Sequence, residues 1–271
     1  MLRRRPLLAA SAALVVAPAS LAQQRRSPGT GAPLRLGVDH ALMESGLARS
    51  LQRGFGADTG IAVNLVAGPA LAVLEAIKEG EVDAALCNAP DAEARLETQG
   101  LVHDRRAIAS GEFVLVGPPP PRLATRQAID RSPFATLTRI RDLAVAEPGS
   151  VTFLSAADGS GGHVLEQALW RGAGIAPAAP WYLAADPAGG FTAQVRARRA
   201  YALVERGAWG ALGGAPLVVL SEGDPMLREA VHAMRSFRAS HPAGKIFLAW
   251  IGGGRGHAVA AAQRGYRAPG R

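Results

Sequence analysis

The sequence is poor in cysteine, lysine and aromatic residues, and each shortage excludes a class of protein. Its one cysteine, Cys87, cannot form an internal disulfide and lies in an apolar run, so we expect it to be a small buried residue. Only 5% of residues are aromatic, and Lys78 and Lys245 are the only lysines. Beyond the N-terminus the arginines are scattered singly or in pairs, unlike the basic face of a nucleic-acid-binding protein. The net charge of +8 therefore does not indicate a nucleic-acid partner.

The first 22 residues have the pattern of a secretory signal peptide. Three arginines at 3–5 precede an apolar run at 6–19, and Ser20-Leu21-Ala22 places small residues at the cleavage site. The run of about 14 apolar residues is shorter than the roughly 20 that a membrane-spanning helix needs. We expect cleavage after residue 22 and a periplasmic mature protein. The pair Arg4-Arg5 leaves both Sec and twin-arginine export open, and residues 23–33 form a flexible polar leader.

After the leader, short apolar strands alternate with amphipathic helices. The expected strands are residues 34–38, 61–66, 82–87, 113–116, 151–154, 181–183 and 217–220. The expected helices are residues 43–55, 70–77, 92–96, 136–144, 163–170, 192–199, 205–211, 223–235 and 245–251. This alternation predicts an α/β fold of βαβ units, with a parallel sheet covered by helices on both faces. We expect residues 252–254 and the arginine-bearing tail after Gly256 to be frayed.

The proline-rich segment "GPPPPR" (117–122) interrupts this pattern and predicts a crossing between two lobes. About 250 mature residues are enough for two separate cores. We assign residues 34–117 and 218–262 to lobe 1, residues 118–217 to lobe 2, and residues 263–271 to a tail. Arg105 and Arg106, near the crossing, are expected to be surface charges.

Several motifs in a fixed order resemble the periplasmic tungstate-binding proteins of ABC transporters. They include "GEVDAALCNAPDAEARLETQG" (80–100), "SAADGSGGH" (155–163) and "AYALVERGAW" (200–209). The resemblance implies a type II periplasmic binding-protein fold, in which two α/β lobes with a parallel or mixed sheet in each close on an oxyanion. It also implies a monomer that delivers its ligand to an ABC permease. It implies neither a cofactor nor a catalytic residue.

The ligand loops of that family are only partly kept here. The family's hydroxyl-rich stretch falls on residues 38–41, which keep no hydroxyl, and its loop arginine falls on Ala156. The neighbouring "ESGL" (44–47) anchors the alignment. The residues that the resemblance places at the ligand are Asp39, His40, Ser45, Gly68, Ser155, Asp158, Gly159, Ser160 and Gly161.

The changed loops leave the identity of the ligand open among three hypotheses. Loss of charge-assisted hydrogen bonds weakens an oxyanion site, although backbone N–H groups at helix starts remain. Asp39, His40 and Asp158, with His163, could instead hold a cation or a cationic organic solute. Backbone groups with Ser45, Ser155 and Ser160 could hold a small neutral or anionic solute. No metal site is predicted, since no pair of ligands has diagnostic spacing.

Three classes of function follow from these observations. The first is a periplasmic solute-binding protein that serves an ABC permease. The second is a sensory or accessory receptor on the same fold, able to bind a cation but taking no part in transport. An enzyme is the weakest interpretation, because no nucleophile–base pair or cofactor motif is recognisable.

Overall fold

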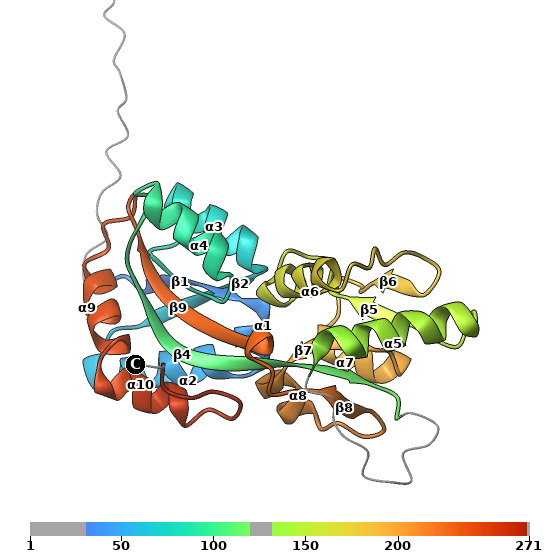
Figure 1. The fold of residues 1–271 in the computed structure, drawn as a ribbon. Coiled ribbons are helices and arrows are strands. Elements are labelled where there is room, and N and C mark those ends of the chain that lie inside the picture. The colour runs from blue at the N-terminus through green and yellow to red at the C-terminus, as the bar shows by residue number, and fades with distance from the viewer. Residues whose placement is uncertain (1–30, 120–131, 270–271) are drawn as a thin grey trace, which may run out of the picture.

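The computed structural model describes residues 31–119 and 132–269. The predicted signal peptide, residues 23–30 of the leader and residues 120–122 of the proline-rich crossing lie outside the described residues. Figure 1 shows two lobes side by side, joined by the long strand β4 (Val102–Gly117), which runs from one lobe into the other. Strand β9 (Arg228–Ser236) pairs antiparallel with β4 along much of its length.

The first lobe has a mixed sheet with the strand order β2-β1-β3-β9-β4. Its other strands are β1 (Leu34–Asp39), β2 (Val63–Gly68) and β3 (Ala84–Cys87). Strand β1 is parallel to both β2 and β3, whereas β9 runs antiparallel to β3. One face packs against α1 (His40–Glu44), α2 (Leu47–Thr59), α9 (Pro242–Ile251) and α10 (Gly254–Ala261). The other packs against α3 (Ala70–Glu79) and α4 (Pro90–Thr98).

The second lobe is built around the far end of β4. Strands β7 (Ala202–Glu205) and β8 (Val218–Ser221) pair antiparallel with it. Strands β5 (Phe153–Ser155) and β6 (Tyr182–Ala184) form a separate parallel pair. Its helices are α5 (Pro133–Ala146), α6 (Gly161–Gly172), α7 (Phe191–Arg198), α8 (Arg206–Leu212) and the 3-10 turn η1 (Pro225–Leu227). The lobe has its own core, in which the rings of Phe153 and Trp170 meet edge to face at 5.1 Å.

The local sequence explains why the helices begin and end where they do. In α2, the side chains of Leu47, Leu51 and Phe55 repeat every four residues and are all buried. Asp39 and Ser160 accept hydrogen bonds from the first turns of α1 and α6, which is the usual role of an N-cap residue. The predicted α/β alternation and the covering of the sheet on both faces are confirmed, whereas the sheet is mixed rather than parallel throughout, because β9 and β4 enter it antiparallel to their neighbours. None of the helices in the described residues is long and apolar enough to span a bilayer.

Two predictions about the C-terminal third are wrong. Residues 228–236 form strand β9 rather than part of a helix. This strand lies between β3 and β4 and is buried on both faces, and such a run cannot be distinguished from a buried helix by periodicity alone. The chain after Gly252 is not frayed: α10 packs on α2 and α9, and Tyr266 is buried in the core of the first lobe.

Candidate functional site

A cavity of about 230 Å³ lies between the two lobes. The first lobe contributes α1 and Pro69, and the second contributes the start of α6, the segment 185–192 and the start of α8. Seven titratable side chains line it: His40, Glu44, Asp158, His163, Glu166, Asp186 and Glu205. Neither lysine nor arginine lines it among the described residues. Although the whole chain is basic, this cavity is rich in carboxyl groups.

Asp39 connects the two lobes at one wall of this region. It ends β1, is fully buried, and caps α1 through a 2.9 Å bond from Ala41 N–H to Oδ1. Its other oxygen, Oδ2, accepts the N–H of Gly161, the first residue of α6, at 3.4 Å. Burial raises the pKa of Asp39 to about 6, and the two N–H donors offset part of that rise. The carboxylate is therefore bonded to the backbone of both lobes.

Three other N–H groups around the start of α6 also have acceptors within the protein. Ser160 N–H donates to Asp158 Oδ1 at 2.9 Å, and His163 N–H donates to the Ser160 hydroxyl at 3.3 Å. Gly159 N–H donates to Nδ1 of His163 at 2.9 Å. A helix N-terminus ordinarily attracts anions through free N–H groups. Here the chain's own acceptors already bind several of these groups, so a free oxyanion that used them would have to displace those acceptors.

Further contacts hold the lobes together around the cavity. Glu44 of α1 accepts the N–H of Phe191 at 3.2 Å through Oε1 and the Thr192 hydroxyl at 3.1 Å through Oε2. Leu71 N–H donates to the carbonyl of Gly159 at 3.1 Å. All of these bonds join residues more than eighty positions apart, so the structure has the two lobes closed on each other.

Two more carboxyl groups lie on the second-lobe side of the cavity and are almost completely buried. Glu166 accepts the Tyr182 hydroxyl at 2.6 Å, and burial raises its pKa to about 7. Glu205 caps α8 by accepting the N–H groups of Gly207 and Ala208, both at 2.8 Å. Burial raises the pKa of Glu205 to about 7 as well, although these two bonds oppose the rise. Both groups can therefore hold or release a proton near neutral pH.

The structure brings most of the predicted site residues to this region. His40, Asp158 and Ser160 line the cavity, and Asp39, Gly159 and Gly161 form the contact between the lobes beside it. The remaining predicted site residues, Ser45, Gly68 and Ser155, are outside the lining.

Each of these three residues has a structural contact instead. Ser45 is buried, with its hydroxyl 2.9 Å from that of Tyr266. Gly68 pairs with Asp39 in the sheet. Ser155 is buried, and its hydroxyl accepts the N–H of Ala157 at 3.2 Å.

The sequence reasoning did not assign Glu44, Glu166, Asp186 and Glu205 to the site. Glu205 begins helix α8 and is buried, while its neighbour Arg206 pairs with Glu112 and Glu222. A strand directly followed by a helix at 202–212 is the signal that could have placed it at a cleft.

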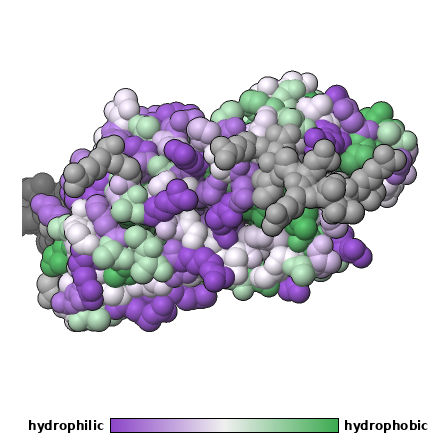
Figure 2. Space-filling view, turned by 60° about the horizontal axis from the view of Figure 1, so that its bottom comes forward, coloured by the Kyte–Doolittle hydropathy of each residue, from purple (hydrophilic) through white to green (hydrophobic). Residues whose placement is uncertain are grey.

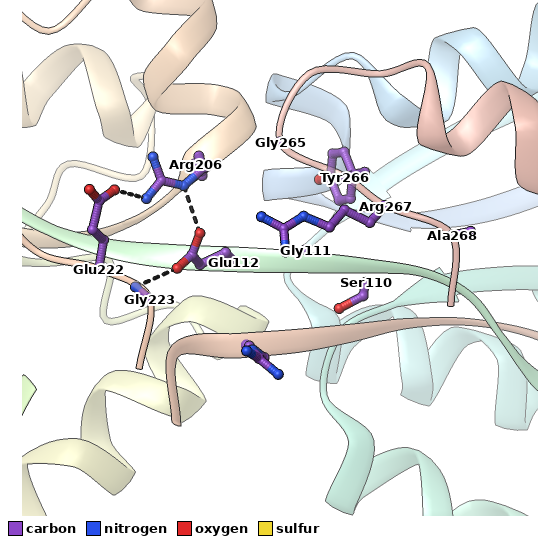
Figure 3. Close-up of a pocket in the computed structure, with 11 residues that line it drawn as sticks. Ser110, Gly111, Glu112, Arg206, Glu222, Gly223, Gly265, Tyr266, Arg267 and Ala268 are labelled. Atoms are coloured by element: carbon purple, nitrogen blue, oxygen red, sulfur yellow. Dashed lines mark hydrogen bonds and ion pairs between the residues drawn. The ribbon is translucent and has the colours of Figure 1, made fainter. Parts of the chain in front are cut away.

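A second, larger pocket of about 970 Å³ lies where β4 and β9 run between the lobes. Figure 3 shows Arg206 between the carboxylates of Glu112 and Glu222, while Glu112 also accepts the N–H of Gly223 at 2.6 Å. On the face in Figure 2, hydrophilic side chains gather over the first lobe and at the junction of the lobes. The ion pairs of Arg206 with Glu112 and Glu222 connect α8 to β4 and to the end of β8. We therefore regard this pocket as part of the connection between the lobes.

No group of three or more His, Cys, Asp or Glu side chains is arranged to hold a metal ion in the part of the chain that the structure describes. Several carboxyls instead have N–H or hydroxyl donors as partners.

Comparison with known proteins agrees with this architecture. A family described as "PBP superfamily domain" matches residues 30–251. The chain is 30% identical over 167 residues to the tungstate-binding protein TupA of Peptoclostridium acidaminophilum. The matched region covers 61% of this chain and 56% of that protein. It is 30% identical over 183 residues to a putative ABC transporter anion-binding protein of Haloferax volcanii, covering 66% and 50%. The chain thus spans about half the length of the curated relatives it matches.

Among solved structures, the tungstate ABC transporter protein from Geobacter sulfurreducens superimposes with a TM-score of 0.71 at 25% identity. The match covers 86% of this chain and 99% of that one. The predicted two-lobed α/β fold of type II periplasmic binding proteins is thereby confirmed.

Proposed function

This chain belongs to the PBP superfamily, and on that basis we propose that it is a periplasmic, non-enzymatic binding protein that delivers a small solute to an ABC permease. The names of the matched relatives support the class of function, since they describe binding proteins of tungstate and of an anion. The cavity between two lobes supports the mode of binding, because closure of such lobes around a ligand is a common transition in this architecture.

The ligand class follows from the charge of the cavity. Its lining carries five carboxyl groups and two imidazoles, and none of the described residues that line it is a lysine or an arginine. An oxyanion needs donors, whereas carboxylates are acceptors that favour cations and N–H groups. We therefore propose a small solute that carries hydrogen-bond donors, a protonated amine above all, in place of tungstate.

The size of the cavity limits the solute further. A volume of about 230 Å³ is below the range typical of pockets for drug-sized ligands. Phe113 and Phe191 also line the cavity and supply apolar surface for a short carbon skeleton. These features fit a small aminated organic compound better than a peptide or a large metabolite.

Thermal-shift and calorimetric titration of the exported protein would test this proposal. The panel should contain tungstate, molybdate, divalent metals and small mono- and diamines. We expect an amine to raise the melting temperature, since a ligand that binds only the folded state stabilises it by mass action. Micromolar tungstate should produce no shift. Tight tungstate binding with no response to amines would contradict the proposed ligand class.

The delivery step needs its own assay. We expect the ligand-loaded protein to stimulate ATP hydrolysis by its partner permease in proteoliposomes, with Glu44→Gln reducing the response at limiting ligand. Normal ligand binding without any stimulation would instead favour a receptor that does not serve transport.

A further inference from the structure

The start of α6 packs against the first lobe, and Asp39 reaches it from that lobe. The two oxygens of Asp39 have different partners. Oδ1 caps α1 within the first lobe, whereas Oδ2 crosses to Gly161 of the second lobe. Capping of α1 requires only one oxygen, so the cap does not account for the contact that crosses the cleft.

A carboxylate in this position makes the interactions that a bound oxyanion would make. Helix α6 has 12 residues, and the backbone dipoles at its N-terminus favour negative charge there. Asp39 supplies such a charge, is fully shielded from solvent, and cannot diffuse away.

An unpartnered amide lies beside the same point. Asn88 follows β3 and is only 3% exposed, and neither Nδ2 nor Oδ1 has a partner within hydrogen-bond distance among the described residues, although the amide lies near the buried carboxyl of Glu229. Its Oδ1 is the atom that lies against Gly161, since a Cβ at position 161 would be 2.1 Å from it. A buried amide without a well-placed partner is costly, and rotation of the amide would bring its N–H₂ group, the kind of donor that an oxyanion uses, to the same point.

We propose that Asp39 is the residue that determines the ligand class, because its carboxylate takes the place at the start of α6 that a free oxyanion would occupy. This inference rests on the proposed solute-binding function. The Asp39 carboxylate excludes tetrahedral oxyanions by occupying their donors and by repelling their charge. It also leaves the adjoining cavity to solutes of the opposite charge.

The test is a gain of function in Asp39→Ser. Serine is also a good N-cap, so α1 keeps its first hydrogen bond while the carboxylate is lost. We expect calorimetry to show that tungstate or molybdate binds this variant at least about tenfold more tightly than wild type, because a charge-assisted bond to Gly161 N–H becomes available. Adding Asn88→Ala should reduce the gain.

The matched control is Asp224→Asn. Asp224 is a carboxylate of the second lobe that accepts the N–H of Met226 within its own loop and does not line the cavity. We expect less than about a threefold change in oxyanion affinity for this variant. An equal gain in Asp224→Asn would overturn the assignment to Asp39 and indicate a general effect of charge.

Scattering in solution gives a second measurement. Asp39→Ser without anion should be more expanded than wild type, and tungstate should make it compact again. If circular dichroism shows that Asp39→Ser is unfolded, Asp39→Asn takes its place, with the same expectation. A folded variant that binds no oxyanion overturns this inference and leaves the amine titration of wild type unaffected. A variant that gains oxyanion binding supports the inference even if wild type binds no amine.

Discussion

Gly161 and Asn88 are packed so closely across the cleft that no side chain fits between them. A Cβ at position 161 would be 2.1 Å from the side-chain oxygen of Asn88 and 2.7 Å from its carbonyl oxygen. One residue begins α6 in the second lobe, and the other follows β3 in the first. Because atoms at these distances overlap, glycine at position 161 is required for the closed arrangement.

Gly161→Ala should therefore prevent full closure. We expect weaker ligand binding, a larger radius of gyration, and a loss of about 1–3 kcal/mol in the free energy of unfolding, as for other overpacked positions. Denaturant melts and solution scattering would measure these effects. The control is Gly254→Ala, at the start of α10, where an added Cβ meets nothing within 4 Å. A Gly161→Ala protein as compact and stable as that control would contradict the close contact.

Glu44 should contribute to closure through its two bonds to the second lobe. In Glu44→Ala the N–H of Phe191 and the hydroxyl of Thr192 lose their acceptor, although water in the cavity can replace it. We expect a cost of about 0.5–1.5 kcal/mol for closure and faster hydrogen exchange at the Phe191 amide. The exposed Glu81, on the first lobe, supplies a control in Glu81→Ala. Unchanged exchange at Phe191 would exclude Glu44 as a tie between the lobes.

Stability should decrease as the pH rises from about 4 to about 7. Burial raises the pKa of Asp39 to about 6 and those of Glu166 and Glu205 to about 7, so the folded protein binds these protons more tightly than the unfolded chain. Their contribution to the free energy of unfolding is fully present below about pH 4. It is lost as the pH rises through the raised pKa values, and the loss is on the order of a few kcal/mol. His163, whose pKa burial lowers, acts in the opposite direction.

Urea melts at pH 5 and pH 7.5 would measure this dependence. Glu166→Gln should flatten it, because glutamine keeps an acceptor for the Tyr182 hydroxyl but has no proton to release. A stability that rises over this interval would show that the three carboxyls are less buried in solution than in the structure.

Arg105 should be much more important for stability than an ordinary surface arginine. We expected it to be a surface charge, and that expectation is wrong. Its guanidinium is 3.0 Å from Oε2 of Glu93, which is fully buried and also lies 2.8 Å from Nδ1 of His232. Arg105→Ala leaves the buried carboxylate without its main counter-charge and should cost about 3–5 kcal/mol.

The control for Arg105→Ala is Arg238→Ala. Arg238 forms an ion pair with Glu79 at 3.3 Å, in which both side chains are largely exposed, so less than about 1 kcal/mol should be lost. Chemical denaturation of the two variants would compare them directly. Equal effects would mean that the Glu93 carboxyl is protonated, or reached by water, in the folded protein.

Local patterns in the sequence were sufficient for much of the fold. The four-residue repeat in α2 and the serine-glycine turn before α6 depend on residues close together in the chain, and both were predicted, although the predicted helix 43–55 is divided at Ser45-Gly46 into α1 and α2. Strand β9 was missed because its burial on both faces comes from neighbours in the sheet rather than from its own alternation.

The site shows the same division between near and distant residues. The sequence by itself determined that a strand leads up to Asp39 and that "SAADGSGGH" leads into a helix. Only the tertiary structure decided that these two segments, 122 residues apart at their contact, share one hydrogen bond. It also decided that Glu166 and Glu205 are buried beside the same cavity. Burial determines the charge state of the carboxyls, and hydrogen bonds between the lobes determine which N–H donors remain free. Both depend on packing between distant segments, which local sequence patterns do not encode.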